Sequence, residues 1–193
     1  MLSHSLVIGY HGCDRILAQR IVAGKSDLQP SQNSWDWLGH GIYFWEDSPA
    51  RALRWAEAEV GKLKSRIKFP AVLGAVIDLR NCMNLADTEA LSLVKSAYQS
   101  YLELCAASSA LPAENRRLDC AVIETLHQLR QKEGKQSFDT ARGFFLERRE
   151  LYPTAGFREL DHIQICVRSS QQIAGYFLPR GNTDRSHQTE SRP

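Results

Sequence analysis

Apolar and polar positions follow one another along the chain in patterns that predict short strands and amphipathic helices. We expect strands where apolar residues alternate or run together, and helices where they recur every three to four positions. The predicted strands are residues 6–10, 42–45, 67–79 and 162–167, and the predicted helices are residues 14–23, 50–64, 87–106 and 115–133. Residues 67–79 are almost continuously apolar, which predicts an interior strand buried on both faces. Strands and helices do not alternate regularly, so the pattern predicts the α+β class.

Residues 134–157 follow the last predicted helix and show no clear period. They hold glycines and a proline among charged and aromatic residues. We expect an ordered functional loop, with room for a short helix around residues 142–145, because long irregular segments in compact domains usually bind something. A solvated connector is the alternative interpretation. Residues 169–177 should close the fold as a short segment. The prediction is one domain over residues 1–180 and a polar, disordered tail over residues 181–193.

The composition is that of a globular protein without a dominant charge. The chain has 193 residues, 43% of them hydrophobic, and a net charge of +2, so no strong attraction to nucleic acid or to an anionic membrane is expected. Five cysteines are scattered without a CxxC pair, which argues against a disulfide framework or a zinc site. No apolar run has the length of a membrane span, and no signal peptide is visible. We therefore expect a cytoplasmic protein that contacts no membrane and holds no metal.

Residues 37–45 read Trp-Leu-Gly-His-Gly-Ile-Tyr-Phe-Trp, which predicts a glycine turn that enters an aromatic strand. Tyr-His-Gly at residues 10–12 ends the first predicted strand, and the last one, residues 162–167, carries a polar residue. Together these elements resemble the diphtheria-toxin and poly(ADP-ribose) polymerase branch of the ADP-ribosyltransferases, whose site is a His-Tyr-Glu triad. The resemblance covers roughly the first 60 residues well. It implies an ADP-ribosyltransferase-like split, mostly antiparallel β-sheet with flanking helices.

The resemblance assigns roles around NAD, the co-substrate of that family. His11 would hydrogen-bond a hydroxyl of the adenosine ribose, and the backbone of Gly12 would approach the nicotinamide carboxamide. Tyr43 would stack on the nicotinamide ring, and Gly41 is a further NAD-binding candidate, because glycine lets the backbone approach a ligand closely. A core histidine and a core tyrosine with satisfied hydrogen bonds are the alternative interpretations of His11 and Tyr43.

The third member of the triad has no exact counterpart in the chain. The family's glutamate hydrogen-bonds the 2′-hydroxyl of the nicotinamide ribose and stabilises developing positive charge, whereas residues 162–167 include no carboxylate. Gln164 is the first candidate, because its amide offers a donor and an acceptor but no charge. Glu159 is the second candidate and Asp161 the third. A solvent-facing strand residue is the alternative interpretation of Gln164.

These residues predict an NAD-dependent mono-ADP-ribosyltransferase, a glycosyltransferase that moves ADP-ribose from NAD to a macromolecular acceptor. The leaving nicotinamide is already cationic, so the barrier lies in an oxocarbenium-like transition state and no general acid is needed. Protein, DNA and RNA are all open as acceptors. In the family, the loop that corresponds to residues 138–157 contacts the acceptor. Small size and the missing signal peptide favour a bacterial toxin or defence effector, with an antitoxin as a further partner.

Two alternatives stay open. A protein of the same fold could bind NAD or ADP-ribose without transferring it, and the missing carboxylate favours this interpretation. An RNA-modifying relative that uses NAD is disfavoured by the near-neutral charge, but a basic face beside the His11 cleft would support it. The arginines that suit the pyrophosphate of NAD are Arg51, Arg54, Arg116 and Arg117.

Overall fold

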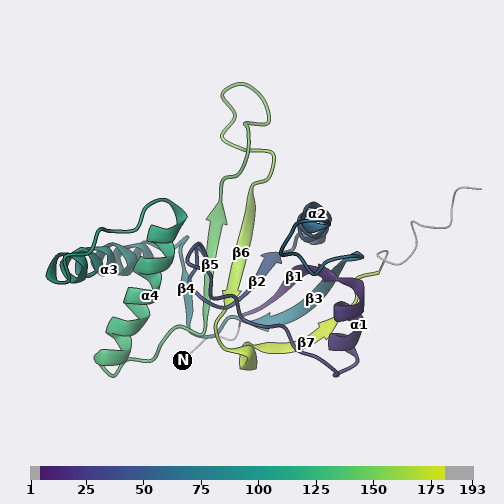
Figure 1. Ribbon diagram of the computed structural model, residues 1–193, viewed down its shortest axis with the longest axis horizontal. Helices are drawn as coiled ribbons and strands as arrows, with labels where there is room; N and C mark the ends of the chain where they lie inside the picture. Colours follow the sequence, from purple (N-terminus) through teal and green to yellow (C-terminus); the bar gives the residue numbers. More distant parts are fainter. Residues whose placement is uncertain (1–4, 181–193) are drawn as a thin grey trace, which may run out of the picture.

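Within residues 5–180, which the computed structural model describes (Figure 1), seven strands and four α-helices form a protein of the α+β class. The predicted disorder of residues 181–193 lies outside the described residues. The elements in chain order are β1 (Leu6–Asp14), α1 (Arg15–Val22), β2 (Ile42–Glu46), α2 (Pro49–Glu59), β3 (Pro70–Asp78), β4 (Cys82–Asn84), α3 (Thr88–Ala107), α4 (Arg116–Lys132), β5 (Thr140–Phe145), β6 (His162–Val167), the 3₁₀ turn η1 (Ser170–Gln172) and β7 (Ile173–Phe177).

The strands form one mixed sheet in the order β4-β5-β6-β2-β1-β3-β7. β4 and β5 run parallel, and every other neighbouring pair is antiparallel. β2, which carries the glycine-aromatic motif, lies in the middle with β6 on one side and β1 on the other. β3 lies between β1 and β7 and is buried along most of its length, which confirms the interior strand predicted from its apolar run.

β1 and β2 stay together over a short stretch only. Their register ends with the pair of Tyr10 and Trp45, whereas β1 goes on pairing with β3 as far as Asp14. Beyond Tyr10 the two strands diverge, and the side chain of His11 bonds the backbone carbonyl of Tyr43 across the opening. The sheet is continuous through β2, but it opens at the point where both motifs meet.

Helices cover both faces of the sheet. On one face, Phe44 and Ile165 pack with α1, and on the other, Cys166 packs with α3 and α4. Successive strand residues point to opposite faces, so Trp45, which packs with Ala52 of α2, lies on the same face as Cys166 and its neighbour across the ladder, Tyr43. One face therefore carries α2 at one end and α3 with α4 at the other, and Figure 1 shows the two groups apart.

The stretch at residues 134–157 differs from the prediction. Residues 142–145, expected as a short helix, belong to β5, which pairs with β4 and β6. Ladders to two neighbours override the weak local pattern of a six-residue strand that contains a glycine. After β5 the chain projects from the body as a long hairpin, residues 146–161, before it returns as β6 (Figure 1).

The four long helices begin close to their predicted starts, but α2 ends earlier than predicted. Its last residue is Glu59 rather than residue 64. Gly61 follows with a φ of 79°, a left-handed conformation that commonly terminates a helix. Within residues 5–180, no helix combines the length and apolar character that a membrane crossing needs.

Candidate functional site

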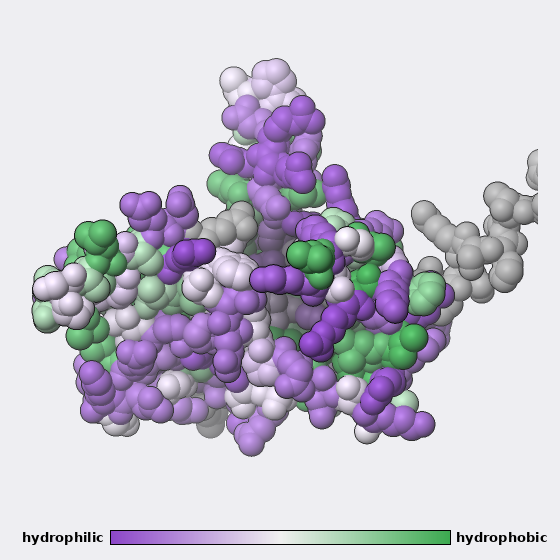
Figure 2. Space-filling model, viewed as in Figure 1, coloured by the Kyte–Doolittle hydropathy of each residue, from purple (hydrophilic) through white to green (hydrophobic). Residues whose placement is uncertain are grey.

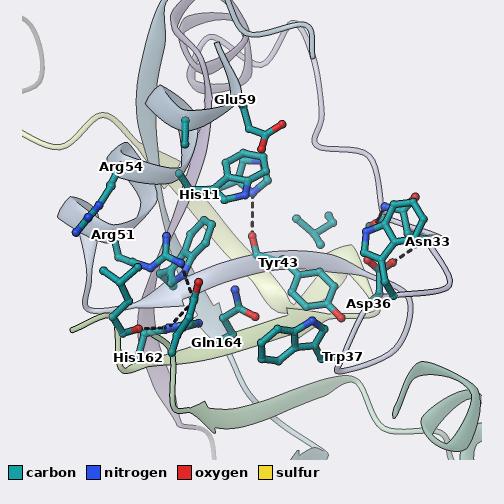
Figure 3. A pocket seen from close by; sticks show the side chains of 18 of the residues that line it. His11, Asn33, Asp36, Trp37, Tyr43, Arg51, Arg54, Glu59, His162 and Gln164 are labelled. Carbon is teal, nitrogen blue, oxygen red and sulfur yellow. Dashed lines mark hydrogen bonds and ion pairs between the residues drawn. The ribbon is translucent and has the colours of Figure 1, made fainter. Parts of the chain in front are cut away.

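A cleft of about 600 Å³ opens on the sheet face that carries Tyr43, a volume typical of small-molecule sites. Its walls are α2, the loop at residues 26–37 and the base of the projecting hairpin. His11 from β1, Tyr43 from β2 and Gln164 from β6 line it (Figure 3). Gly41, in the turn before β2, lines it as well. Within residues 5–180, no group of three or more His, Cys, Asp or Glu side chains is placed to hold a metal ion.

The hydrogen bond that His11 makes identifies which of its two ring nitrogens carries a proton. Its Nδ1 lies 2.8 Å from the carbonyl oxygen of Tyr43 (Figure 3), and a carbonyl only accepts hydrogen bonds, so Nδ1 is the protonated nitrogen. Burial lowers the pKa of His11, although the bond to Tyr43 acts in the opposite direction. The ring is therefore neutral at pH 7, and its Nε2 keeps a lone pair that accepts a hydrogen bond from a hydroxyl.

The hydroxyl of Tyr43 is fully engaged by the turn before its own strand. It donates to the carbonyl of Gly39 at 2.8 Å and accepts from the amide of Leu38 at 2.9 Å. Burial raises the pKa of Tyr43, so the hydroxyl stays protonated. Gly39 has a φ of 80°, which favours glycine at this turn. The ring of Tyr43, rather than its hydroxyl, is the part available to a ligand.

Gln164 lies on β6 opposite Trp45 of β2, and its neighbour two positions earlier, His162, also lines the cleft. Cys166, two positions after Gln164, is buried against α3 and α4, so this side of the strand passes from the cleft into the core. The Gln164 amide makes no hydrogen bond to any side chain or backbone group that the structure describes, and Figure 3 shows it among the cleft side chains. An amide in this position offers a ligand one donor group and one acceptor.

Three of the predicted candidates do not line the cleft. Gly12 lies beneath α2, where a Cβ atom would collide with the Ala52 carbonyl oxygen, so helix packing accounts for the glycine. Glu159 lies on the projecting hairpin and accepts a hydrogen bond from Arg149 at 3.3 Å. Asp161 accepts from two backbone amides of the hairpin at 3.0 and 2.8 Å and closes its base. Gln164 is therefore the triad candidate that the fold brings to His11 and Tyr43.

An ion pair joins α2 to the hairpin at the edge of the cleft. Arg51 Nη2 lies 2.7 Å from Glu147 Oε2, and the guanidinium lies 5.3 Å from the centre of the Trp45 ring. His162 Nδ1 bonds the Leu160 carbonyl at 2.6 Å, and burial lowers the pKa of His162. These residues all line the cleft: Trp45, Arg51, Glu147, Leu160 and His162. Glu147 carries no sequence signal for this role, because its partner lies 96 residues away along the chain.

Two buried N–H donors in the cleft wall lack an acceptor among the described residues, the indole Nε1 of Trp45 and Nε of Arg51. An unmet buried donor costs about 1–3 kcal/mol, and a phosphate or amide oxygen would satisfy it. Of the arginines suggested for a pyrophosphate, Arg51 and Arg54 line the cleft, whereas Arg117 lines a separate surface depression. The side chain of Arg116 is outside the described part of the structure.

Helix α4 fixes the turn before β2 through a charged network that the sequence analysis missed. Glu124 accepts from the backbone amide of His40 at 2.8 Å and pairs with Arg168 at 2.6 Å. Arg168 also donates to the His40 carbonyl at 3.1 Å. Burial acts to raise the pKa of Glu124, but the bonds from Arg168 and His40 lower it overall. Because the same turn holds the Tyr43 hydroxyl, α4 positions Tyr43 indirectly.

Comparisons with known proteins do not assign a family. No protein-family model matches the chain, and no solved structure matches it significantly. The chain is 42% identical over 55 residues to an uncharacterized protein of Methanocaldococcus jannaschii, a stretch that covers 28% of this chain and 25% of that protein. This chain thus spans about a quarter of the relative's length, and the likeness carries no activity with it.

Proposed function

We propose that the protein is an NAD-dependent mono-ADP-ribosyltransferase with an ADP-ribosyltransferase-like fold. The observation that carries the proposal is the convergence of His11, Tyr43 and Gln164 on one cleft from the neighbouring strands β1, β2 and β6. Their types and their order along the chain follow the His-Tyr-Glu triad that the motifs resemble, apart from the amide in third place. The opening between β1 and β2 supports the split-sheet part of the proposal.

NAD offers a chemical partner to each of these groups. Nε2 of His11 accepts a hydrogen bond from a ribose hydroxyl, and the ring of Tyr43 presents an aromatic surface to nicotinamide. The amide of Gln164 both donates to and accepts from hydroxyls of the nicotinamide ribose. Arg51 and Arg54 are the guanidinium groups in the cleft wall that suit a pyrophosphate.

The transfer breaks the bond between the ribose carbon and the nicotinamide nitrogen. The electron pair of that bond stays on the nitrogen, so nicotinamide leaves as a neutral molecule. A lone pair of the acceptor forms the new bond to the ribose carbon, and the acceptor loses its proton to solvent. The residues of the cleft accelerate this step by holding NAD in a reactive pose and by placing fixed dipoles around the ribose.

The amide in third place supports a second candidate function, an NAD- or ADP-ribose-binding protein without transferase activity. A carboxylate stabilises an oxocarbenium-like transition state by its charge, and Gln164 carries no charge. Glu147 lines the same cleft, but its carboxylate is already paired with Arg51. Binding requires only the hydrogen bonds that Gln164 retains, so it does not depend on a carboxylate.

Transfer of label from adenylate-labelled NAD to cell lysate, DNA or RNA tests the first function. Wild-type protein should label a macromolecule and release nicotinamide, and His11→Ala, Tyr43→Ala and Gln164→Ala should each slow the transfer roughly 10- to 100-fold. Gln128→Ala on the exposed face of α4 is the matched control and should keep the wild-type rate. Glu159→Ala should also keep it, because Glu159 lies outside the cleft.

Thermal unfolding with and without NAD separates the two functions. NAD that raises the unfolding temperature of the wild type, without transfer of label or release of nicotinamide, would establish the binding protein instead of the enzyme. Neither protection nor transfer would contradict both. Loss of transfer in Glu159→Ala but not in Gln164→Ala would give the third role to the hairpin.

A further inference from the structure

The loop between α2 and β3, residues 60–69, is the most basic segment beside the cleft. It reads Val-Gly-Lys-Leu-Lys-Ser-Arg-Ile-Lys-Phe and contains no acidic residue. Lys62 pairs with Glu59 of α2, and the charge of Lys68 interacts with the Asp14 carboxylate. Lys64 and Arg66 are exposed and form no ion pair with any residue that the structure describes. The small net charge of the whole chain therefore coexists with a local excess of positive charge in this loop.

This basic loop begins at the cleft and has a fixed far end. Lys62, in the loop, and Arg54, on α2 before it, both line the cleft. At the other end, the backbone amides of Lys68 and Phe69 donate to the Asp14 carboxylate at 2.9 and 3.0 Å, which anchors the loop to the end of β1. The basic loop thus runs from the cleft, at Lys62, to the end of β1.

Large apolar side chains are exposed both in the basic loop and at the cleft. Leu63 is fully exposed, and Phe69 is about half exposed. Trp35 and Trp55 line the cleft while remaining exposed to solvent. Figure 2 shows hydrophilic and apolar residues side by side around α2. Cations interleaved with exposed aromatic rings are the composition of surfaces that bind unpaired nucleic acid, in which phosphates meet the cations and bases stack on the rings.

The cleft itself selects between paired and unpaired strands. Its volume of about 600 Å³ is that of a small-molecule site and is far too small for a double helix, so only an unpaired nucleotide at its mouth could bring an acceptor group to NAD in the cleft. RNA is the nucleic acid that characteristically presents unpaired bases, in loops and at ends. An acceptor group on such a nucleotide would reach the cleft while the adjoining phosphates follow the basic loop.

We propose that the basic loop, residues 60–69, binds unpaired RNA and presents it to the His11 cleft as the acceptor. The proposal rests on the transferase function above and names its substrate class. An oxygen or nitrogen lone pair of the RNA forms the bond to the ribose carbon of NAD, nicotinamide leaves with the electron pair of the broken bond, and any proton on the RNA nucleophile goes to solvent.

Fluorescence anisotropy with a short, unstructured, labelled RNA and no NAD measures this binding independently of transfer. The combined variant Lys64→Glu, Arg66→Glu and Lys68→Glu should weaken binding at least tenfold. It should also reduce the slope of log K against log salt by about 2, because each phosphate contact to a single strand contributes about 0.7. Lys64→Gln with Arg66→Gln should give a smaller loss in the same direction, which keeps the test valid if the triple variant is unstable.

The matched control carries the same change of charge at the opposite end of the molecule. Lys95→Glu, Lys132→Glu and Lys135→Glu alter exposed residues of α3, of α4 and of the turn after α4, and this variant should bind RNA like the wild type. Equal weakening by both triple variants would overturn the proposal, because general charge rather than the basic loop would then explain binding. Absence of RNA binding by the wild type would overturn it as well.

Two further measurements distinguish RNA binding from binding of single-stranded DNA, and the RNA surface from the NAD site. A single-stranded DNA of matched sequence should bind more weakly than the RNA, and equal or tighter binding would overturn the assignment to RNA. The triple loop variant should retain thermal protection by NAD, because the substituted residues do not line the cleft. RNA binding by a wild type that NAD does not protect would mean that the transferase function fails while the RNA surface exists.

Discussion

At the scale of single residues, Tyr43 uses its ring and its hydroxyl for different purposes. The ring lines the cleft, whereas the hydroxyl bonds Leu38 and Gly39 of the preceding turn. Leu38 is completely buried, so its amide finds no water if the hydroxyl is removed. The same side chain therefore connects the stability of the turn with the shape of the site, and the two contributions are separable by mutation.

Tyr43→Phe should keep the ring and lose the turn bonds. We expect the free energy of unfolding to fall by about 1–3 kcal/mol, because a buried amide and a carbonyl lose their partner. Urea denaturation measures this change. Tyr152→Phe on the exposed hairpin is the control and should change stability by less than about 0.5 kcal/mol. Equal stability of the two variants would show that the hydroxyl bonds contribute nothing.

Sequence patterns predicted which residues line the cleft better than they predicted why each residue is there. His11, Gly41, Tyr43 and Gln164 line one cleft as a set, because each stands at a strand or turn position that local motifs reveal. Gly12 belongs to the same motif as His11, yet the close approach of α2 accounts for it. Gly41 lines the cleft, but a Cβ atom there would collide with Cys166 Sγ and the Val167 carbonyl oxygen, so packing against β6 accounts for this glycine as well.

At the scale of elements, α4 supports a turn that lies far from it in sequence. Glu124 and Arg168 enclose the backbone of His40 from the helix and from the end of β6. Both charged side chains are largely shielded from solvent, so each depends on the other for compensation of its charge. Removal of one leaves the other poorly solvated next to the turn that holds Tyr43.

Arg168→Met should therefore lower the free energy of unfolding by about 2–4 kcal/mol, since it leaves Glu124 without its cation. It should also reduce thermal protection by NAD, because the turn positions the Tyr43 ring. Arg149→Met is the matched control: its partner Glu159 lies on the exposed hairpin, and exposed pairs contribute little. A loss of stability no larger than that of the control would refute the role of the Glu124–Arg168 pair.

Long helices with a clear periodicity of apolar residues were predictable from the sequence. A short strand whose conformation depends on pairing with other strands was not. α3 and α4 run 20 and 17 residues, long enough for a helical period to appear above chance. β5 has six residues with Arg142 and Gly143 at its centre, and pairing with β4 and β6 decides its conformation. The Arg142–Glu46 ion pair, which joins residues 96 positions apart, was invisible for the same reason.

At the scale of the whole molecule, the site exists because of strand order. His11, Tyr43 and Gln164 lie far apart along the chain, and the order β6-β2-β1 makes their strands neighbours. The opening between β1 and β2 then leaves space above the sheet. Residues of α2 and of the hairpin line this space. Local patterns predict each strand, but long-range pairing determines which strands meet, so the cleft could be described only from the assembled sheet.

Folding also favours the neutral form of three histidines, of which His127 and His162 are buried and His11 is partly buried. Burial lowers the pKa of His11, His127 and His162, and for His127 it lowers the pKa from 6.5 to about 4. Neither ring nitrogen of His127 has a hydrogen-bond partner among the described residues, and its ring meets Phe138 edge to face. Protonation of any of the three therefore favours the unfolded chain, in which the rings take up protons near their ordinary pKa.

The folded state should consequently lose stability as pH falls from about 6.5 towards 4. In this range the unfolded chain binds more protons than the folded one, so the free energy of unfolding decreases with falling pH. His127 alone should contribute up to about 3 kcal/mol, at 1.36 kcal/mol per pKa unit. Urea denaturation at a series of pH values measures the slope, and His127→Leu should flatten it.

Leu126→Ala, which opens a cavity without removing a titrating group, should lower stability at every pH and keep the wild-type slope. A His127→Leu slope equal to that of the wild type would mean that another group is responsible for the acid sensitivity.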